Sequence, residues 1–109
     1  MKLSQLELSL IFPAYNEEAN IVETVQSALV FIELYQAEII VVDDGSIDKT
    51  VERLQPFQDK INIVRHSQNQ GYGAALRSGF ACAKGSWIFF CDSDLQFPLD
   101  SLHEFLKYI

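Results

Sequence analysis

The sequence predicts an α/β domain, residues 1–109, built on a mostly parallel sheet of about four strands with helices on both faces. Short apolar runs alternate four times with amphipathic segments, in the order β-α-β-α-β-α-β-α. The apolar runs lack the polar alternation of half-exposed strands, and helix-length segments separate them, as parallel strands require. Because 49% of the 109 residues are hydrophobic, we expect one domain with a substantial core.

The first predicted strand and helix lie near the start of the chain. Leu8–Pro13 is an apolar run that a proline closes. Residues 16–35 then carry apolar side chains at helical spacing, which predicts a helix with one buried face. Asn16 is expected to cap this helix, and Glu17 and Glu18 lie where its positive end favours acidic side chains.

The remaining elements follow the same alternation. Glu38–Val42 has a β-branched centre, and residues 46–57 form the next helix, with Ser46 or Asp48 as its cap. The last two predicted strands are residues 60–66 and 86–91, and the last two predicted helices lie within residues 69–85 and 97–109. The helix within residues 69–85 is expected to pack on the sheet through Ala75, Leu76, Gly79, Phe80 and Ala83.

The composition excludes several classes of function. Fifteen acidic residues against eight basic ones argue against nucleic acid as a partner, because phosphate contacts need clustered Lys and Arg. No apolar run approaches the roughly 18–20 residues of a membrane span, and the first ten residues do not resemble a signal peptide. Cys82 and Cys91 show no metal-binding spacing, so we expect reduced thiols in a cytoplasmic protein.

Each predicted strand is followed directly by a polar motif. "PAYNEE" follows the first strand, "DDGSIDKT" the second, "SQNQGYG" the third and "DSDLQFP" the fourth. In a parallel sheet with right-handed crossovers, the carboxyl ends of the strands meet at one edge. The four motifs are therefore expected to converge on one crevice, which predicts a binding site there.

Asp92 and Asp94 lie one residue apart, directly after the fourth predicted strand. Two carboxylates this close repel each other unless one takes up a proton or a cation binds both. Carboxylate oxygens suit Mg²⁺ or Mn²⁺, and Gln96 can add an amide oxygen. This interpretation predicts a metal that carries a diphosphate on its far side. The alternative is a helix-capping aspartate beside a solvated one.

Asp43 and Asp44 form a second acidic pair at a strand end. Neighbouring side chains of an extended chain point to opposite sides, so one carboxylate can face the crevice while the other braces the turn. A carboxylate in the crevice suits hydrogen bonds from a nucleobase or a ribose. Tyr15 can stack on a base and Glu17 can bind a ribose, although both also fit structural roles in their loop.

The segment "GYGAAL" is a poor match to a dinucleotide-binding loop. Its third position is Leu76, and it follows the third strand rather than the first. Gly71 and Gly73 are better explained by a tight turn near a ligand. His66 and His103 have no partner at a recognisable spacing, and they are assigned no role.

Taken together and in this order, "FPAYNEEANI", "IIVVDDGSIDKT", "NQGYGAALRSGF" and "DSDLQFP" resemble glycosyltransferase family 2. The resemblance runs from about Leu8 to Phe105 and implies a Rossmann-like GT-A half-domain. The last motif is most similar to the dolichyl- or polyprenyl-phosphate sugar transferases, which often carry D-A-D-L-Q. Ser93 stands here in place of the commoner alanine and removes neither carboxylate.

The resemblance implies an inverting transferase that uses a UDP- or GDP-sugar and a divalent metal, Mg²⁺ or Mn²⁺. It implies no catalytic residue within this chain. The nucleoside pocket would be lined by Pro13, Tyr15, Glu17, Val42 and Asp44. Asp92 and Ser93 would lie near the diphosphate, and the metal site would be formed by Asp92, Asp94 and Gln96.

Members of this family continue beyond the length of this chain. Their later half supplies acceptor-binding residues and, in many polyprenyl-phosphate enzymes, membrane helices. We therefore expect residues 1–109 to be the donor-binding, N-terminal part of a longer catalytic domain, inactive alone. The expected acceptor is a polyprenyl phosphate or a glycan, and the expected location is the cytoplasm, at the cytoplasmic face of a membrane in the longer protein.

Three other interpretations remain open from the residues. A signalling receiver domain also has an acidic pair after a buried strand, but it needs an aspartate after the third strand, where this chain has Ser67. A haloacid-dehalogenase-like phosphatase uses D-x-D with a metal, but Gln96 stands where a Thr or Val is usual. The exposed sheet edge beside residues 86–91 also predicts self-association into a homodimer.

Overall fold

The computed structural model describes residues 8–93 and 99–107. Its centre is a four-stranded sheet in which all neighbouring strands are parallel, in the spatial order β3-β2-β1-β4. The first described strand, β1, is an inner strand of this sheet; the chain then moves outward through β2 and β3, and β4 lies on the far side of β1. The strand order therefore reverses beside β1, where a ligand crevice is expected. The strands are β1 (Leu8–Ala14), β2 (Ala37–Asp43), β3 (Asn62–Arg65) and β4 (Trp87–Phe90).

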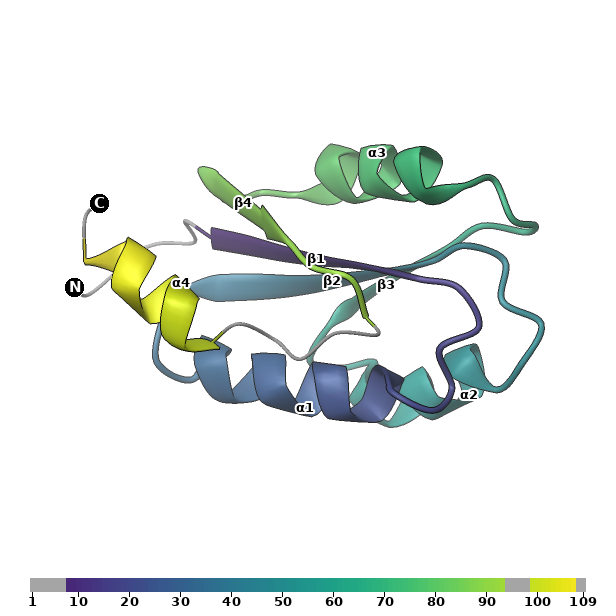
Figure 1. The fold of residues 1–109 in the computed structure, drawn as a ribbon, viewed down its shortest axis with the longest axis horizontal. Helices are drawn as coiled ribbons and strands as arrows, with labels where there is room; N and C mark the ends of the chain where they lie inside the picture. The colour runs from purple at the N-terminus through teal and green to yellow at the C-terminus, as the bar shows by residue number, and fades with distance from the viewer. Residues whose placement is uncertain (1–7, 94–98, 108–109) are drawn as a thin grey trace.

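Helices cover both faces of the sheet, as the sequence predicts (Figure 1). One face carries α1, α2 and α4, and the other carries α3 (Figure 1). None of the described helices is long and apolar enough to span a membrane. The helices are α1 (Ile21–Ile32), α2 (Thr50–Leu54), the 3₁₀ turn η1 (Gln55–Phe57), α3 (Tyr72–Cys82) and α4 (Leu99–Leu106).

Alternate side chains of the two central strands enter two separate cores. Leu10 and Phe12 belong to the larger core beneath α1, whereas Ile11 and Val42 belong to the smaller core beneath α3. Helix α3 approaches the sheet closely at Gly79, because a Cβ there would lie 2.6 Å from Ile11 Cγ2. The period-two pattern of β1 and β2 thus buries both faces of the central strands.

The first helix starts later than predicted, and Asn16 does not cap it. Helix α1 begins at Ile21, after a turn, and Asn16 has a positive φ of 53°. Its backbone N–H donates to Ser46 Oγ at 2.9 Å, and its Oδ1 accepts from the N–H of Ile47 at 3.0 Å. The expected cap therefore joins two loops, an arrangement that helical periodicity does not reveal.

The second helix is shorter than predicted. Asp48 Oδ1 accepts a hydrogen bond from the backbone N–H of Thr50, the first residue of α2, at 2.9 Å. The N-cap position is held by Lys49, which makes no side-chain capping bond, so neither Ser46 nor Asp48 is the cap that was predicted; Asp48 contacts the first helical N–H from the residue before the cap. The last turn tightens into η1, which contains Pro56, because proline lacks the N–H of an α-helical turn.

The predicted packing face of the third helix is partly wrong. Ala75 and Gly79 are buried, but Phe80 is 42% exposed. Helix α3 lies over β1 and β2, so the Phe80 ring reaches the sheet edge and meets the Phe90 ring edge to face, with centroids 6.1 Å apart. Ala83 follows the end of the helix in extended conformation, although it still packs against the smaller core.

Candidate functional site

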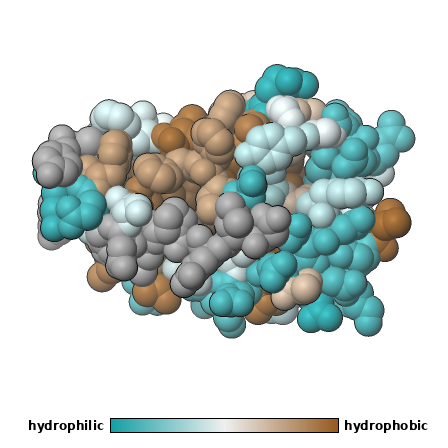
Figure 2. Space-filling model, viewed as in Figure 1, coloured by the Kyte–Doolittle hydropathy of each residue, from teal (hydrophilic) through white to brown (hydrophobic). Residues whose placement is uncertain are grey.

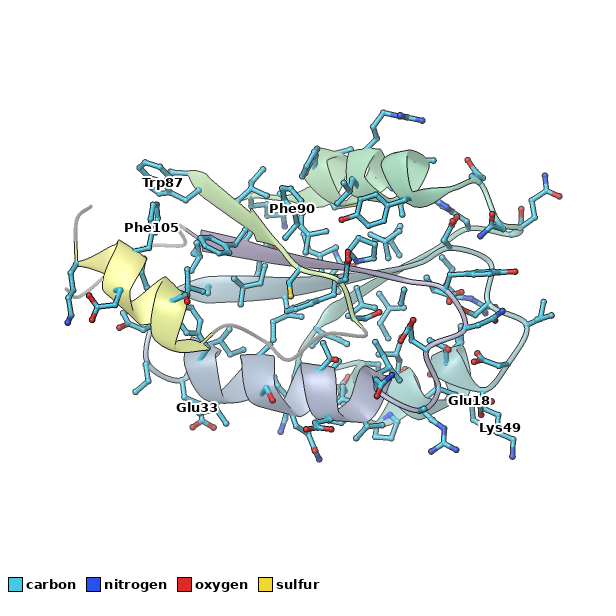
Figure 3. All side chains as sticks on the ribbon, viewed as in Figure 1. Glu18, Glu33, Lys49, Trp87, Phe90 and Phe105 are labelled. Atoms are coloured by element: carbon cyan, nitrogen blue, oxygen red, sulfur yellow. The ribbon has the colours of Figure 1, made fainter. Side chains whose placement is uncertain are left out.

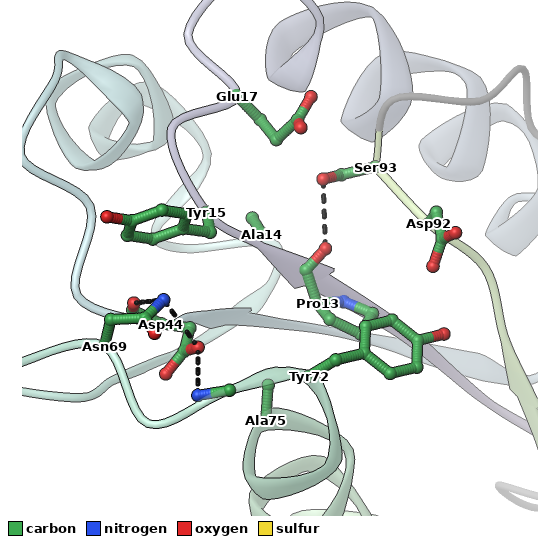
Figure 4. Close-up of a pocket in the computed structure, with 11 residues that line it drawn as sticks. Pro13, Ala14, Tyr15, Glu17, Asp44, Asn69, Tyr72, Ala75, Asp92 and Ser93 are labelled. Atoms are coloured by element: carbon green, nitrogen blue, oxygen red, sulfur yellow. Dashed lines mark hydrogen bonds between the residues drawn. The ribbon is translucent and has the colours of Figure 1, made fainter.

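A cleft of about 500 Å³ opens at the carboxyl edge of the sheet. Its walls come from the ends of β1, β2 and β4 and from the loop that leads into α3 (Figure 4). These segments follow four different strands, so the convergence expected from a parallel sheet is present. Six residues of the predicted nucleotide site line this cleft: Pro13, Tyr15, Glu17, Asp44, Asp92 and Ser93.

Among the predicted site residues that the structure describes, only Val42 does not line the cleft. Val42 is fully buried in the core between the sheet and α3, so its side chain supports the cleft from below. Asp94 and Gln96, two of the three predicted metal ligands, lie outside the described residues. The cleft also has lining residues that the sequence did not single out as ligand contacts: Ala14, Asn69, Gly71, Tyr72 and Ala75.

Tyr15 and Glu17 are held in the cleft by contacts between the loops that follow β1 and β2. The Glu17 backbone N–H donates to Thr50 Oγ1 at 2.8 Å, and Asn16 exchanges hydrogen bonds with the 46–47 segment. These bonds fix the backbone on both sides of Tyr15, a residue that remains 44% exposed. In the view of Figure 4, the Tyr15 and Tyr72 rings stand on opposite sides of the opening.

The Asp44 side chain has four hydrogen-bond partners in the protein. Its Oδ1 accepts from Gln70 N at 2.9 Å and lies 2.7 Å from His66 Nδ1. Its Oδ2 accepts from Gly71 N at 2.9 Å and from Asn69 Nδ2 at 3.1 Å. An ionised carboxylate offers about four acceptor positions, and all of them face donors of the protein.

The surroundings of Asp44 keep it ionised. Burial alone would raise the pKa of this carboxyl group. The hydrogen bond with His66, the N–H groups of Gln70 and Gly71, and the charge of His66 outweigh burial and hold its pKa below the ordinary 3.8.

The two aspartates of the second acidic pair point to opposite sides of β2. Asp44 lines the cleft, whereas the Asp43 side chain is fully buried on the other face. The nearest cation to Asp43 among the described ion pairs is Arg65, with Nε 3.9 Å from Oδ2. The alternation of an extended backbone separates the pair in this way, so only one of the two carboxylates faces the cleft.

Asp92 and Ser93 close the cleft on the β4 side. Ser93 Oγ donates to the Pro13 carbonyl at 3.0 Å, and the Ser93 carbonyl accepts from Thr24 Oγ1 at 2.8 Å. Asp92 lies beside Tyr72. Burial raises the pKa of the Tyr72 hydroxyl, and the hydrogen bond and negative charge of Asp92 raise it further. The Ser93 hydroxyl is therefore used internally, and Asp92 presents its carboxylate to the cleft.

The described part of the cleft supplies one carboxylate of the predicted metal site. No group of three or more His, Cys, Asp or Glu side chains arranged to hold a metal occurs within residues 8–93 and 99–107. Asp92 has the hard oxygen donors that Mg²⁺ and Mn²⁺ prefer. The metal site remains a prediction from the "DSDLQ" motif.

Comparison with known proteins decides the family. The family model described as Glycosyl transferase family 2 matches residues 9–109. The chain belongs to glycosyltransferase family 2. Membership in this family replaces the receiver-like and phosphatase-like interpretations.

Relatives of this family 2 chain include transferases that act on lipid phosphates. It is 36% identical to the dolichyl-phosphate beta-glucosyltransferase of Drosophila melanogaster, over 95% of this chain and 36% of that protein. The chain thus spans about a third of the length of such relatives. The similarity confirms the predicted relation to polyprenyl-phosphate sugar transferases.

Solved structures confirm the GT-A half-domain. The S. aureus TarS 1–349 structure in complex with UDP-GlcNAc matches 94% of this family 2 chain and 31% of TarS, with a TM-score of 0.79 and 27% identity. Glucosyl-3-phosphoglycerate synthase from Mycobacterium tuberculosis, in complex with Mn²⁺, UDP and glucosyl-3-phosphoglycerate, matches 80% of this chain and 33% of that chain, with a TM-score of 0.69 and 32% identity.

Proposed function

We propose that this chain is the donor-binding half of an inverting glycosyltransferase that uses a UDP- or GDP-sugar. The observation that carries the proposal is the single cleft formed by four strand-end loops, with an exposed aromatic ring on one wall and carboxylates around it. The similarity to TarS, whose structure holds UDP-GlcNAc, supports it, as do relatives named as dolichyl-phosphate glucosyltransferases. The acceptor is a polyprenyl phosphate or a glycan bound by a further part of a longer protein, which would act at the cytoplasmic face of a membrane.

The nucleoside would lie between the β1 and β2 loops. Tyr15 offers an exposed ring for stacking on the base, because its loop is held by Asn16 and Thr50. Glu17 provides a carboxylate toward the ribose, whereas Asp44, whose acceptor positions face donors of the protein, holds the cleft wall beside the base. The diphosphate would then extend toward Asp92 and Ser93 on the β4 side.

The charge of the cleft favours a divalent metal. Its described lining includes the carboxylates of Glu17, Asp44 and Asp92, and no Lys or Arg side chain. A diphosphate entering this lining would be repelled unless a cation lay between it and the protein. We assign that cation, Mg²⁺ or Mn²⁺, to Asp92 together with Asp94 and Gln96. When bound, it would neutralise charge on the nucleoside diphosphate as the sugar leaves.

Calorimetric titration with UDP and GDP, with and without Mn²⁺, tests the donor and metal proposals. We expect one of the two nucleotides to bind at least about tenfold more tightly with Mn²⁺, an effect of about 1.4 kcal/mol. Asp92→Asn should remove most of the metal dependence, whereas Asp59→Asn, a control outside the cleft, should retain it. Equal affinity with Mn²⁺ and with EDTA would contradict the metal site, and binding of neither nucleotide would contradict the donor site.

The open edge of the sheet supports a second proposal, self-association. Among the described strands, β4 pairs only with β1, and it exposes Trp87, Ile88 and Phe90 by 44%, 41% and 51%. Apolar residues gather between α3 and β4 in Figure 2, and Figure 3 shows Trp87 and Phe90 along this strand. An exposed edge with apolar side chains is a template for pairing with a second copy.

Sedimentation velocity tests this pairing. The chain is expected to form a dimer that dissociates in Phe90→Glu. Leu34→Glu changes an exposed leucine away from β4 and should leave the dimer intact. A wild-type chain that stays monomeric at millimolar concentration would rule the pairing out.

A further inference from the structure

His66 links three elements beside the cleft. It follows β3 directly, its side chain is only 9% exposed, and its ring lies between β2 and α3. Nδ1 lies 2.7 Å from Asp44 Oδ1, and Nε2 lies 2.7 Å from Ser78 Oγ. Both ring nitrogens are therefore engaged with side chains of the protein.

The chemistry of these partners determines where the proton lies on the ring. The Asp44 carboxylate is ionised at neutral pH and can only accept, so Nδ1 must carry a hydrogen and donate it. In the neutral ring, Nε2 then accepts from the Ser78 hydroxyl. The geometry selects the Nδ1–H tautomer.

The donation from His66 completes the shell of hydrogen bonds around Asp44. The remaining donors to this carboxylate come from Asn69, Gln70 and Gly71, which form the loop before α3. Two of these three, Asn69 and Gly71, also line the cleft. A change in the orientation of Asp44 would therefore move one wall of the cleft.

We propose that His66 is a positioning residue of the nucleotide site, acting through Asp44 on the loop of residues 69–71. The inference rests on the proposed function, because the wall in question belongs to the nucleotide cleft. A preorganised carboxylate and loop reduce the ordering that binding requires, so loss of the His66 donor weakens nucleotide binding. The role is separate from packing, because it depends on a hydrogen at one ring nitrogen.

The contacts of His66 with Asp44 on one side and Ser78 on the other also resemble the triad of a serine hydrolase. Ser78 lies inside α3, between Tyr72 and Cys82, and it does not line the cleft. The Asp44 carboxylate also holds a loop, in addition to orienting His66. The arrangement therefore suits a fixed structural contact, in which the serine hydroxyl serves His66.

Two matched substitutions of His66 separate its two contacts. In His66→Asn, the amide nitrogen can occupy the position of Nδ1 and donate to Asp44, but the side chain no longer reaches Ser78. In His66→Gln, the longer side chain reaches Ser78 but places no donor at the Nδ1 position. Ser78→Ala removes the second contact alone.

Calorimetry with the nucleotide that the wild type binds more tightly gives the first readout. We expect affinity within about threefold of wild type for His66→Asn and Ser78→Ala, and about tenfold weaker binding for His66→Gln. If His66→Asn and His66→Gln lose nucleotide affinity equally, and each loss parallels a loss of unfolding free energy, His66 acts only through packing. Hydrolysis of a simple ester that Ser78→Ala abolishes would overturn the assignment in favour of a triad.

Nuclear magnetic resonance gives a second readout that needs no nucleotide. The ¹⁵N shifts of His66 should show hydrogen on Nδ1, and amide exchange at Gln70 and Gly71 should accelerate in His66→Gln but not in His66→Asn. Hydrogen on Nε2 alone, or unchanged exchange in His66→Gln, would overturn the proposal. If the wild type binds neither UDP nor GDP, the proposed function fails, and these measurements still decide whether His66 positions the loop.

Discussion

Two carboxylates on the same face of β2, Asp44 and Glu38, accept hydrogen bonds from the backbone just before and just after helix α3. The two differ in burial and in what surrounds them. Asp44, at the carboxyl edge of the sheet, is buried and accepts from Gln70 and Gly71, just before the helix. Glu38, six residues earlier and near the amino edge, is half-buried. It accepts at Oε2 from Lys84 N at 2.7 Å and from Ser9 Oγ at 2.6 Å. Asp44 lines the candidate nucleotide cleft, whereas Glu38 and Lys84 border a separate pocket at the amino edge that holds none of the predicted site residues.

The difference follows from the direction of the strands and helices. In a parallel sheet, crossover helices begin at the carboxyl edge, so their N–H groups and positive ends gather there. A carboxylate at that edge is held by loop N–H groups and stays ionised, as the lowered pKa of Asp44 shows. The amino edge receives helix ends whose carbonyl groups are already directed outward. Hydrogen bonds from backbone N–H groups to a carboxylate therefore shape a ligand site at the carboxyl edge and only hold the chain in place at the amino edge.

The largest expected effect on the free energy of unfolding comes from substituting the glycine near each end of α3, Gly45 beside Asp44 and Gly85 beside Lys84. Gly45 has a φ of +74°, and a Cβ there would overlap the backbone of Gln68 and Asn69, whereas a Cβ on Gly85 would lie 2.8 Å from the backbone of Leu8 and Ser9. Gly45→Ala should lower the free energy of unfolding by about 4 kcal/mol and Gly85→Ala by about 2 kcal/mol. Urea denaturation measures both values. A larger loss of unfolding free energy in Gly85→Ala than in Gly45→Ala would contradict the greater backbone strain expected at Gly45.

Exchange of each carboxyl for an amide should have the next largest effect. Asp44→Asn turns an N–H donor toward donors of the protein and should cost about 2–3 kcal/mol, because hydrogen bonds to a buried charged group are lost. Glu38→Gln keeps an acceptor oxygen and should cost about 1 kcal/mol or less. Nucleotide affinity should fall in Asp44→Asn alone, and equal losses of affinity would show that the amino edge also shapes the cleft.

The smallest effect concerns pH. The pKa of Asp44 is lower in the folded chain than its ordinary 3.8, so its ionised form stabilises the fold above about pH 4. This contribution is lost as the pH falls through the folded-state pKa. The difference in unfolding free energy between wild type and Asp44→Asn should therefore shrink below pH 4, as followed by urea denaturation at several pH values. A difference that stays constant down to pH 2 would show that ionisation of Asp44 is not its source.

Much of the site was predictable because it depends on chain direction and on short periods. Apolar runs separated by helices predicted the parallel sheet, and strand ends predicted the rim on which Tyr15, Glu17, Asp44 and Asp92 meet. Alternation also predicted that only one residue of the Asp43–Asp44 pair faces the cleft. These inferences need no knowledge of contacts between distant residues.

Other features depend on partners far apart in the chain. Asn16 was predicted as a helix cap and instead joins the loop at residues 46–47, thirty residues away. Phe80 was predicted in the helix packing face and instead meets Phe90 at the sheet edge. His66 was assigned no role, although its position directly after β3 matches that of Asp44 after β2. This matching position at neighbouring strand ends was the signal in the sequence that could have placed His66 beside Asp44.

The order of strands and helices and the edge that carries the site were determined by the sequence alone, because side-chain period and chain direction are local properties. The tertiary structure decided which hydrogen bonds these residues make. Asp44 acquires its four donors and His66 its tautomer only when β2, β3 and the start of α3 are brought together. Hydrogen-bond geometry is specific to within fractions of an ångström, and periodicity along a chain carries no information at that scale.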